Sequence, residues 1–279
     1  MKNILLPTDF TDCSLNAIKY AFDLFRGQAC NFYLLSIHKA WDYATEDLMA
    51  ASAEESVYDS VLKDNRQKLE ELIDELKKGI GDQAYVLKPV TGYDVFTDAI
   101  NQAVELNEID LIVMGTDGAT GPKEIIFGSH SIRVIRKVNC PLLVIPLNSS
   151  FLKLEKVLLA LSAEKIFQST AADALLDLGG SRHPSVEVIR MLSEEKMESE
   201  TGEENEIRTA FRDCKVDIHP ISGVPFTEAV NSSVQVMNVD LLLLPVKREE
   251  FLERLMFGSE VSRIIYTTTV PILIVHEVE

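Results

Sequence analysis

Short apolar runs alternate with longer amphipathic stretches along the first half of the chain. Between the runs, apolar residues recur every three or four positions, which is the spacing of one helix face. Strands that alternate with helices predict right-handed crossovers, and therefore a parallel sheet with helices on both faces. The runs that indicate buried strands are Lys2–Leu6, Asn31–His38, Ala84–Val90, Leu111–Met114 and Leu142–Ile145. This pattern predicts a doubly wound α/β domain.

Capping residues set the expected limits of the helices. Thr11 or Asp12 can cap the first helix, and Gly27 is expected to end it. Helical periodicity returns in the later part of the segment Trp41–Lys78, and Gly79 and Gly81 are expected to end that helix. A further helix is expected from Asp94 to Leu106, with four apolar residues turned inward: Val95, Ala99, Ala103 and Leu106.

The order of elements starts again in the second half. Lys156–Leu161 (KVLLAL) echoes Asn3–Thr8 (NILLPT). The stretch from Asp240 to Val275 aligns without a gap with Asp110–Ile145, at an offset of 130 positions (240 − 110). A repeat of this length indicates two domains of one fold. We expect domains at residues 1–147 and 154–279, joined by a short linker.

Composition and net charge limit the classes of partner that the chain is expected to bind. The chain has 279 residues, of which 46% are hydrophobic and 25% charged, and its formal net charge is −17. Nucleic acid and anionic membrane surfaces are therefore poor partners. The four cysteines show no C-x-x-C spacing, which favours reduced thiols. No signal segment and no apolar run of membrane-spanning length is present, so we expect a cytoplasmic protein.

A glycine-rich stretch follows the fourth expected strand, with the spacing Gly115-x2-Gly118-x9-Gly128-Ser129. Glycines at the carboxyl end of a strand let the backbone turn sharply and approach a ligand. Ser129 and Ser131 lie where the next helix begins, so free N–H groups and the positive end of the helix dipole would face an anion. The stretch therefore predicts a phosphate cradle. Its spacing matches neither the G-x-G-x-x-G fingerprint nor a P-loop.

This spacing resembles the nucleotide-binding signature of the universal stress protein family, G-2x-G-9x-G-(S/T), and the resemblance extends to both halves of the chain. It implies binding of ATP, or of AMP or ADP, in a Rossmann-like domain with strand order 3-2-1-4-5. The stretch Pro7-Thr8-Asp9 resembles the first-strand motif of the family, and Ile37 the position whose backbone meets adenine. The resemblance favours a hydrogen bond from Asp9 to ribose or base over the alternative, a cap of the local turn, while Ile37 from the residues alone would be a core residue.

The nucleotide-binding residues expected on these grounds fall in three groups, at the first strand, the second strand and the glycine stretch. They are Pro7, Thr8, Asp9, Ile37, Gly115, Thr116, Gly118, Gly128, Ser129, His130 and Ser131. Asp117 could carry Mg²⁺ through the phosphates. The five histidines show no metal-binding spacing.

The second copy departs from the signature. Pro245 replaces Gly115 and Arg248 replaces Gly118, while Asp9 falls opposite Ser162 or Ala163, depending on the alignment of the first strands. Phe127-Gly128-Ser129 nevertheless recurs as Phe257-Gly258-Ser259, so this tripeptide also serves to start a helix. We expect a degenerate second domain. Its acidic segment, Ser193–Glu206, is expected to be solvated.

Strand five lies at the edge of the sheet in the implied order. An apolar edge is an aggregation hazard unless it is covered, and Leu142–Ile145 and its copy Ile272–Val275 share this hazard. Antiparallel pairing of the two edges would make a pseudo-dimer within one chain; a homodimer is the other possibility. No nucleophile, base or metal cluster accompanies the cradle, so we expect an adenine-nucleotide-binding stress or regulatory protein without efficient turnover. A slow ATPase or phosphotransferase and a nucleotide-free interaction module are the alternatives.

Overall fold

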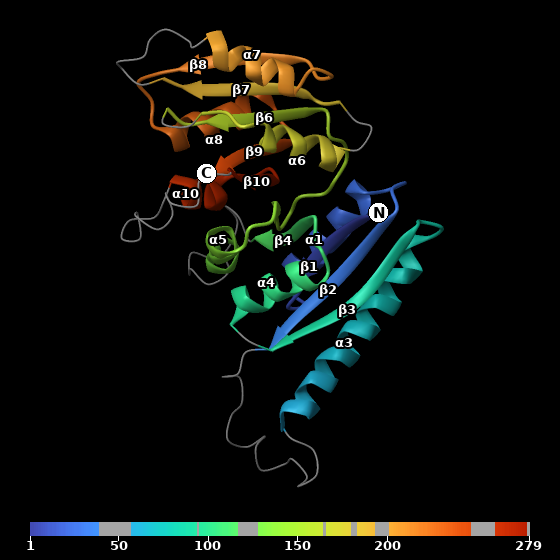
Figure 1. Ribbon diagram of the computed structural model, residues 1–279. Helices are drawn as coiled ribbons and strands as arrows, with labels where there is room; N and C mark the ends of the chain where they lie inside the picture. Colours follow the sequence, from blue (N-terminus) through green and yellow to red (C-terminus); the bar gives the residue numbers. More distant parts are fainter. Residues whose placement is uncertain are drawn as a thin grey trace.

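The computed structural model describes residues 1–38, 57–93, 95–116, 128–163, 166–179, 183–192, 201–246 and 260–277. These residues form one sheet with helices on both faces (Figure 1). The strands are β1 (Lys2–Pro7), β2 (Cys30–His38), β3 (Tyr85–Tyr93), β4 (Leu111–Thr116), β5 (Leu142–Pro146), β6 (Lys156–Leu161), β7 (Ser185–Met191), β8 (Val216–Ile221), β9 (Leu241–Val246) and β10 (Ile272–His276). The helices are α1 (Asp12–Leu24), α3 (Val57–Ile80), α4 (Phe96–Leu106), α5 (Gly128–Lys137), α6 (Ser169–Gly179), α7 (Thr201–Ala210), α8 (Phe226–Met237) and α10 (Glu260–Thr267).

The strand order confirms both the expected repeat and the expected way in which its copies join. The order is β3-β2-β1-β4-β5-β10-β9-β6-β7-β8, so each half has the order 3-2-1-4-5 and the halves meet at their fifth strands. Neighbouring strands within each half pair in parallel, whereas β5 and β10 pair antiparallel, with Ile272 opposite Val144 and Ile274 opposite Leu142. Figure 1 shows β3 and β8 at opposite ends of the molecule. The chain is thus a pseudo-dimer of two Rossmann-like halves whose strands form one continuous sheet.

Two hydrophobic cores lie on the two faces of this sheet. Helices α1, α3, α6 and α7 supply buried residues to one core, and α4, α5, α8 and α10 supply the other. Each core contains residues from both halves of the chain: Ile4 and Val157 share one, and Leu5 and Leu158 share the other. Because neither core ends at the β5–β10 seam, the domain limits 1–147 and 154–279 stay a prediction.

The linker between the halves is held on α1. The Asn16 side-chain amide donates to the carbonyls of Pro146 and Ser149, at 3.3 and 3.0 Å. The ring of Phe151 lies edge-on to that of Tyr20, with centroids 5.5 Å apart. These contacts keep the connection short and fixed.

Three expectations about helices were wrong in detail. Helix α3 runs through Gly79, because a helical glycine costs only about 1 kcal/mol, and it ends before Gly81, where φ is +64°. Val95 is 59% exposed because it is the extended N-cap residue and not part of the helical stripe of α4. Leu106, the last residue of α4, is 82% exposed.

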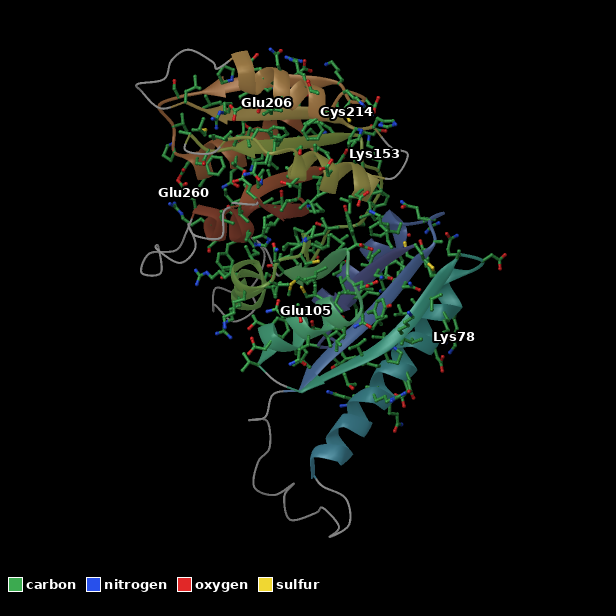
Figure 2. The ribbon with its side chains drawn as sticks, viewed as in Figure 1. Lys78, Glu105, Lys153, Glu206, Cys214 and Glu260 are labelled. Carbon is green, nitrogen blue, oxygen red and sulfur yellow. The ribbon has the colours of Figure 1, made fainter. Side chains whose placement is uncertain are left out.

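Residues 193–200 of the acidic segment lie outside the described residues, and the rest of it, at the start of α7, is only partly solvated. Glu206 is exposed on the surface of α7 (Figure 2). Lys78 on α3 and Glu105 on α4 are exposed in the same way. Glu203, in contrast, turns inward: its side chain is 10% exposed, pairs with Arg190 at 2.9 Å and accepts the N–H of Phe167. Within the described residues, no helix is long and apolar enough to span a membrane.

Candidate functional site

A cleft lies in the first half of the chain, where the carboxyl ends of β1, β2 and β4 meet the start of α1. Its cavity has a volume of about 140 Å³ and opens to solvent at its mouth. The residues that line it come from five elements and the turn between β1 and α1: Pro7, Thr8, Asp9, Thr11, Cys13, Ser14, Leu35, Ile37, Phe96, Met114 and Gly115. Ligands of open α/β sheets bind at this edge.

The turn between β1 and α1 is fixed by its own side chains. Thr8 is buried, its N–H donates to the carbonyl of Leu35 at 2.8 Å, and its hydroxyl is 3.0 Å from that of Ser14. The same hydroxyl accepts the N–H of Phe10, which adopts a left-handed backbone with φ of +65°. A bulky residue in this region stores strain on the order of 1 kcal/mol, and such strain gathers at functional sites. The turn is therefore held in one shape.

Asp9 presents its carboxylate at the mouth of the cleft. Its Oδ1 accepts the N–H and the hydroxyl of Thr11, at 3.1 and 2.6 Å, so it does stabilise the local turn. Partial burial alone would raise the pKa of this carboxyl, but the hydrogen bonds from Thr11 and Ser14 outweigh it and hold the pKa below 3.8. Asp9 is thus ionised at neutral pH, and both hydrogen bonds from Thr11 use the same oxygen, Oδ1.

The side of the cleft formed by the sheet is apolar. Leu35 and Ile37 on β2, Met114 on β4 and Phe96 at the start of α4 line it. Leu35 and Met114 are buried core residues, whereas Ile37 is half-buried, so the sequence-based reading of Ile37 as core holds only in part. The residues from β2, β4 and α4 are therefore suited to a flat apolar group, and those of the β1–α1 turn to polar atoms.

Gly115 is required by α1. A Cβ built on Gly115 would lie 2.5 Å from the carbonyl oxygen of Cys13 and 2.6 Å from its Sγ. No side chain fits there, because real Cβ atoms do not approach backbone so closely. Gly115 was expected to allow the close approach of a ligand. In the structure it allows close packing of the amino end of α1, which places Cys13 and Ser14 at the cleft.

Helix α5 begins at Gly128, at the same edge of the sheet as the cleft. It follows β4 and leads into β5, so it runs opposite to both strands and its amino end lies at their carboxyl side. Ser131 is 0% exposed, and its hydroxyl has no hydrogen-bond partner among the described residues. An orphaned buried hydroxyl one turn into such a helix fits a site that a polar ligand completes. The same position in the second half holds Val261, an apolar residue.

The structure brings part of the expected site together. Pro7, Thr8, Asp9, Ile37 and Gly115 line one cleft, and Gly128, Ser129 and His130 form the first turn of the helix at its edge. Thr116 is 2% exposed at the end of β4 and does not line the cleft. Gly118 and Asp117 lie outside the described residues.

Sequence reasoning did not single out Cys13, Ser14, Leu35, Phe96 or Met114 as site residues. Leu35 and Met114 are apolar strand residues like their neighbours, so nothing in their pattern marks the cleft. Cys13 and Ser14 could have been found, since they form the first turn of a helix that starts at the end of β1.

The register of the second half settles which residue replaces Asp9. Ile4 pairs with Leu111 in the first half, and Val157 pairs with Leu241, its equivalent, in the second. The two first strands are therefore offset by 153 positions (157 − 4), and Ser162 stands opposite Asp9. Pro245, in place of Gly115, lies within β9. The second half lacks both the carboxylate and the close-approach glycine.

Comparison with known proteins gives one family. Residues 1–146 match the model described as the universal stress protein family. Universal stress protein MJ0531 of Methanocaldococcus jannaschii is 29% identical over 144 residues, covering 52% of this chain and 81% of that protein. Universal stress protein Slr1230 of Synechocystis is 25% identical and covers 98% of this chain and 99% of its own. A solved universal stress protein from Archaeoglobus fulgidus superposes with a TM-score of 0.73 at 18% identity, covering 98% of both chains, so it has the same fold.

Proposed function

The chain belongs to the universal stress protein family, and we propose that its first half binds one adenine nucleotide without efficient turnover. The observation that carries the proposal is the cleft at the ends of β1 and β4, which has one apolar and one polar wall. Adenine is flat and largely apolar, ribose offers hydroxyl groups, and the phosphates are anionic. The cleft offers a surface for the base and the ribose, and the start of α5, at the same edge of the sheet, is available to the phosphates.

Each part of the nucleotide has a candidate group. The wall of Leu35, Ile37 and Phe96 would hold the base by apolar contact. The ionised carboxylate of Asp9 accepts hydrogen bonds and suits the ribose hydroxyls. The N–H groups and dipole at the start of α5 would hold the phosphates, and local donors of this kind are needed because the net charge is −17.

Binding without turnover is supported by the use of the polar groups. Among the described residues of the cleft, Asp9 is the one carboxylate, and its Oδ1 already accepts two hydrogen bonds from Thr11. A base that activates an attacking water needs a lone pair aimed at that water. Asp9 is tied to the turn and lies on the ribose side of the proposed pose.

Calorimetric titration with ATP tests the proposal, with AMP and ADP as further ligands. We expect one site per chain, since only the first half keeps Gly115 and Asp9. Two equivalent sites, or no binding of any of the three nucleotides, would contradict it. Phosphate release measured with ATP and Mg²⁺ separates a binder from an enzyme: sustained turnover would favour the ATPase alternative.

Gly118→Arg gives an independent check. The second half carries Arg248 at this position, so we expect the variant to fold and to lose nucleotide binding. Circular dichroism and the thermal midpoint report the fold, and titration reports binding. Unchanged affinity would remove Gly118 from the site.

A further inference from the structure

The two ends of α5 serve different halves of the molecule. Its first turn carries Gly128 and Ser129, at the proposed nucleotide site. Its last turn faces the second half: the Nε2 of His276, the last residue of β10, lies 2.6 Å from the carbonyl oxygen of Ile135. A carbonyl oxygen can only accept, so the imidazole donates. The second half therefore supplies a hydrogen bond to the helix of the first.

This hydrogen bond forms part of the cap of α5. The last four carbonyls of a helix have no partner within the helix and must find one elsewhere. The carbonyl of Val134 accepts the N–H of Val138 at 2.8 Å, and that of Lys137 accepts the side-chain amide of Asn101 at 3.3 Å. His276 satisfies Ile135 between them. It also brings an imidazole to the negative end of the helix dipole, a position that favours cationic groups.

The hydrogen bond from His276 does not follow the pseudo-two-fold symmetry that relates the two halves. At the offset of 130 positions, Pro146 is the equivalent of His276 and Ile265 is the equivalent of Ile135. A proline side chain has no N–H and cannot donate to a carbonyl. The helix of the first half is thus capped by a side chain of the second half, and the equivalent residue of the first half, Pro146, cannot return the bond to α10. The half that keeps the glycine signature is the half that receives this bond.

From this asymmetry we infer that His276 is a positioning residue for the nucleotide site of the first half, acting through α5. A ten-residue helix moves largely as one rigid piece, so a cap that fixes its carboxyl end also fixes its amino end. The preorganised N–H groups of the first turn then need little reordering when phosphate binds. The degenerate half contributes to affinity without binding a ligand itself. This inference rests on the proposed nucleotide function.

His276→Phe keeps an aromatic ring and removes the donor, whereas His276→Gln keeps a donor. We expect roughly three- to tenfold weaker ATP binding by His276→Phe, the effect of one lost hydrogen bond, and most of the affinity restored in His276→Gln. His219→Phe is the matched control: it removes a 2.7 Å contact with Glu187 on β7 and β8, away from α5, and should leave ATP affinity unchanged.

Hydrogen exchange without nucleotide gives a second measurement that does not depend on ligand binding. In His276→Phe the amides of α5 should exchange faster than in the wild type, with α1 and α4 unaffected, and in His219→Phe they should not change. Equal α5 protection in wild type and His276→Phe would overturn the positioning role. If the wild type fails to bind ATP, the nucleotide proposal falls, while faster α5 exchange in His276→Phe would still support the cap. Wild-type ATP affinity in His276→Phe, despite faster exchange, would show that the cap does not serve the site and would overturn the inference.

Discussion

Leu143 of β5 lies directly opposite Leu273 of β10, and the two leucines occupy the same position in their repeats, 130 residues apart (273 − 143). A residue that faces its own copy marks the local pseudo-two-fold axis. The flanking pairs, Val144 with Ile272 and Leu142 with Ile274, follow the same symmetry. The chain has therefore joined two halves as an isologous dimer would join, with both partners on one polypeptide.

Cutting the chain at this seam should expose an apolar edge. Residues 1–147 expressed alone would leave β5, which is fully buried in the intact chain, without its β10 partner. We expect the fragment to dimerise through β5 or to aggregate, as light scattering would show. In a dimer, the β5 amides should keep their protection from hydrogen exchange. A stable monomer with unprotected β5 amides would contradict the prediction; the intact chain at the same concentration is the control.

Gly115 and Gly79 offer a matched pair of substitutions. Gly115→Ala forces a Cβ to within 2.5 Å of the Cys13 carbonyl, so α1 must shift, and we expect a loss of about 1–3 kcal/mol of unfolding free energy with weaker ATP binding. Gly79→Ala adds a Cβ that meets nothing within 4 Å in a helix and should gain about 0.5–1 kcal/mol. Urea unfolding measures both. Equal effects would mean that the close approach of α1 does not matter.

Asp9 should give the chain part of its acid sensitivity. Its folded pKa lies below its ordinary value of 3.8, so its contribution to stability is present above that pH and is lost as the pH falls below it. Asn keeps an acceptor for Thr11 but does not titrate. Urea midpoints measured at decreasing pH should therefore fall less steeply in Asp9→Asn than in the wild type. Asp82→Asn, an exposed site outside the cleft, is the control, and parallel curves for all three proteins would refute the assignment.

The Arg190–Glu203 pair should matter far more than an exposed pair of similar geometry. The two side chains are 17% and 10% exposed, so Glu203→Gln leaves a largely buried guanidinium without its counter-charge. We expect a loss of roughly 2–3 kcal/mol. Glu70→Gln removes the partner of Arg66, at 3.0 Å but 55–68% exposed, and should cost less than about 0.5 kcal/mol. Chemical denaturation compares the two variants directly.

Much of the fold could be predicted because local patterns carry it. The apolar runs at Lys2–Leu6 and Leu142–Ile145 became β1 and β5 with small changes of length. Thr11 caps α1 as its residue type indicated, with its hydroxyl accepting the N–H of Ser14. The gap-free match between Asp110–Ile145 and Asp240–Val275 predicted a second copy of the fold. Period, capping and repeat are properties of neighbouring residues, so the sequence alone determined the elements, the two copies and the glycine spacing.

Only the tertiary structure decided which distant residues meet. Glu203 looked solvated within an acidic run, but it pairs with Arg190 on β7. Gly115 looked like a ligand contact, but its missing Cβ first makes room for Cys13. No sequence pattern marked His276 as important. Antiparallel pairing of β5 and β10 places it at the carboxyl end of α5. Such contacts depend on the order of the strands and on how the two halves pack against each other. A local sequence pattern holds no information about either.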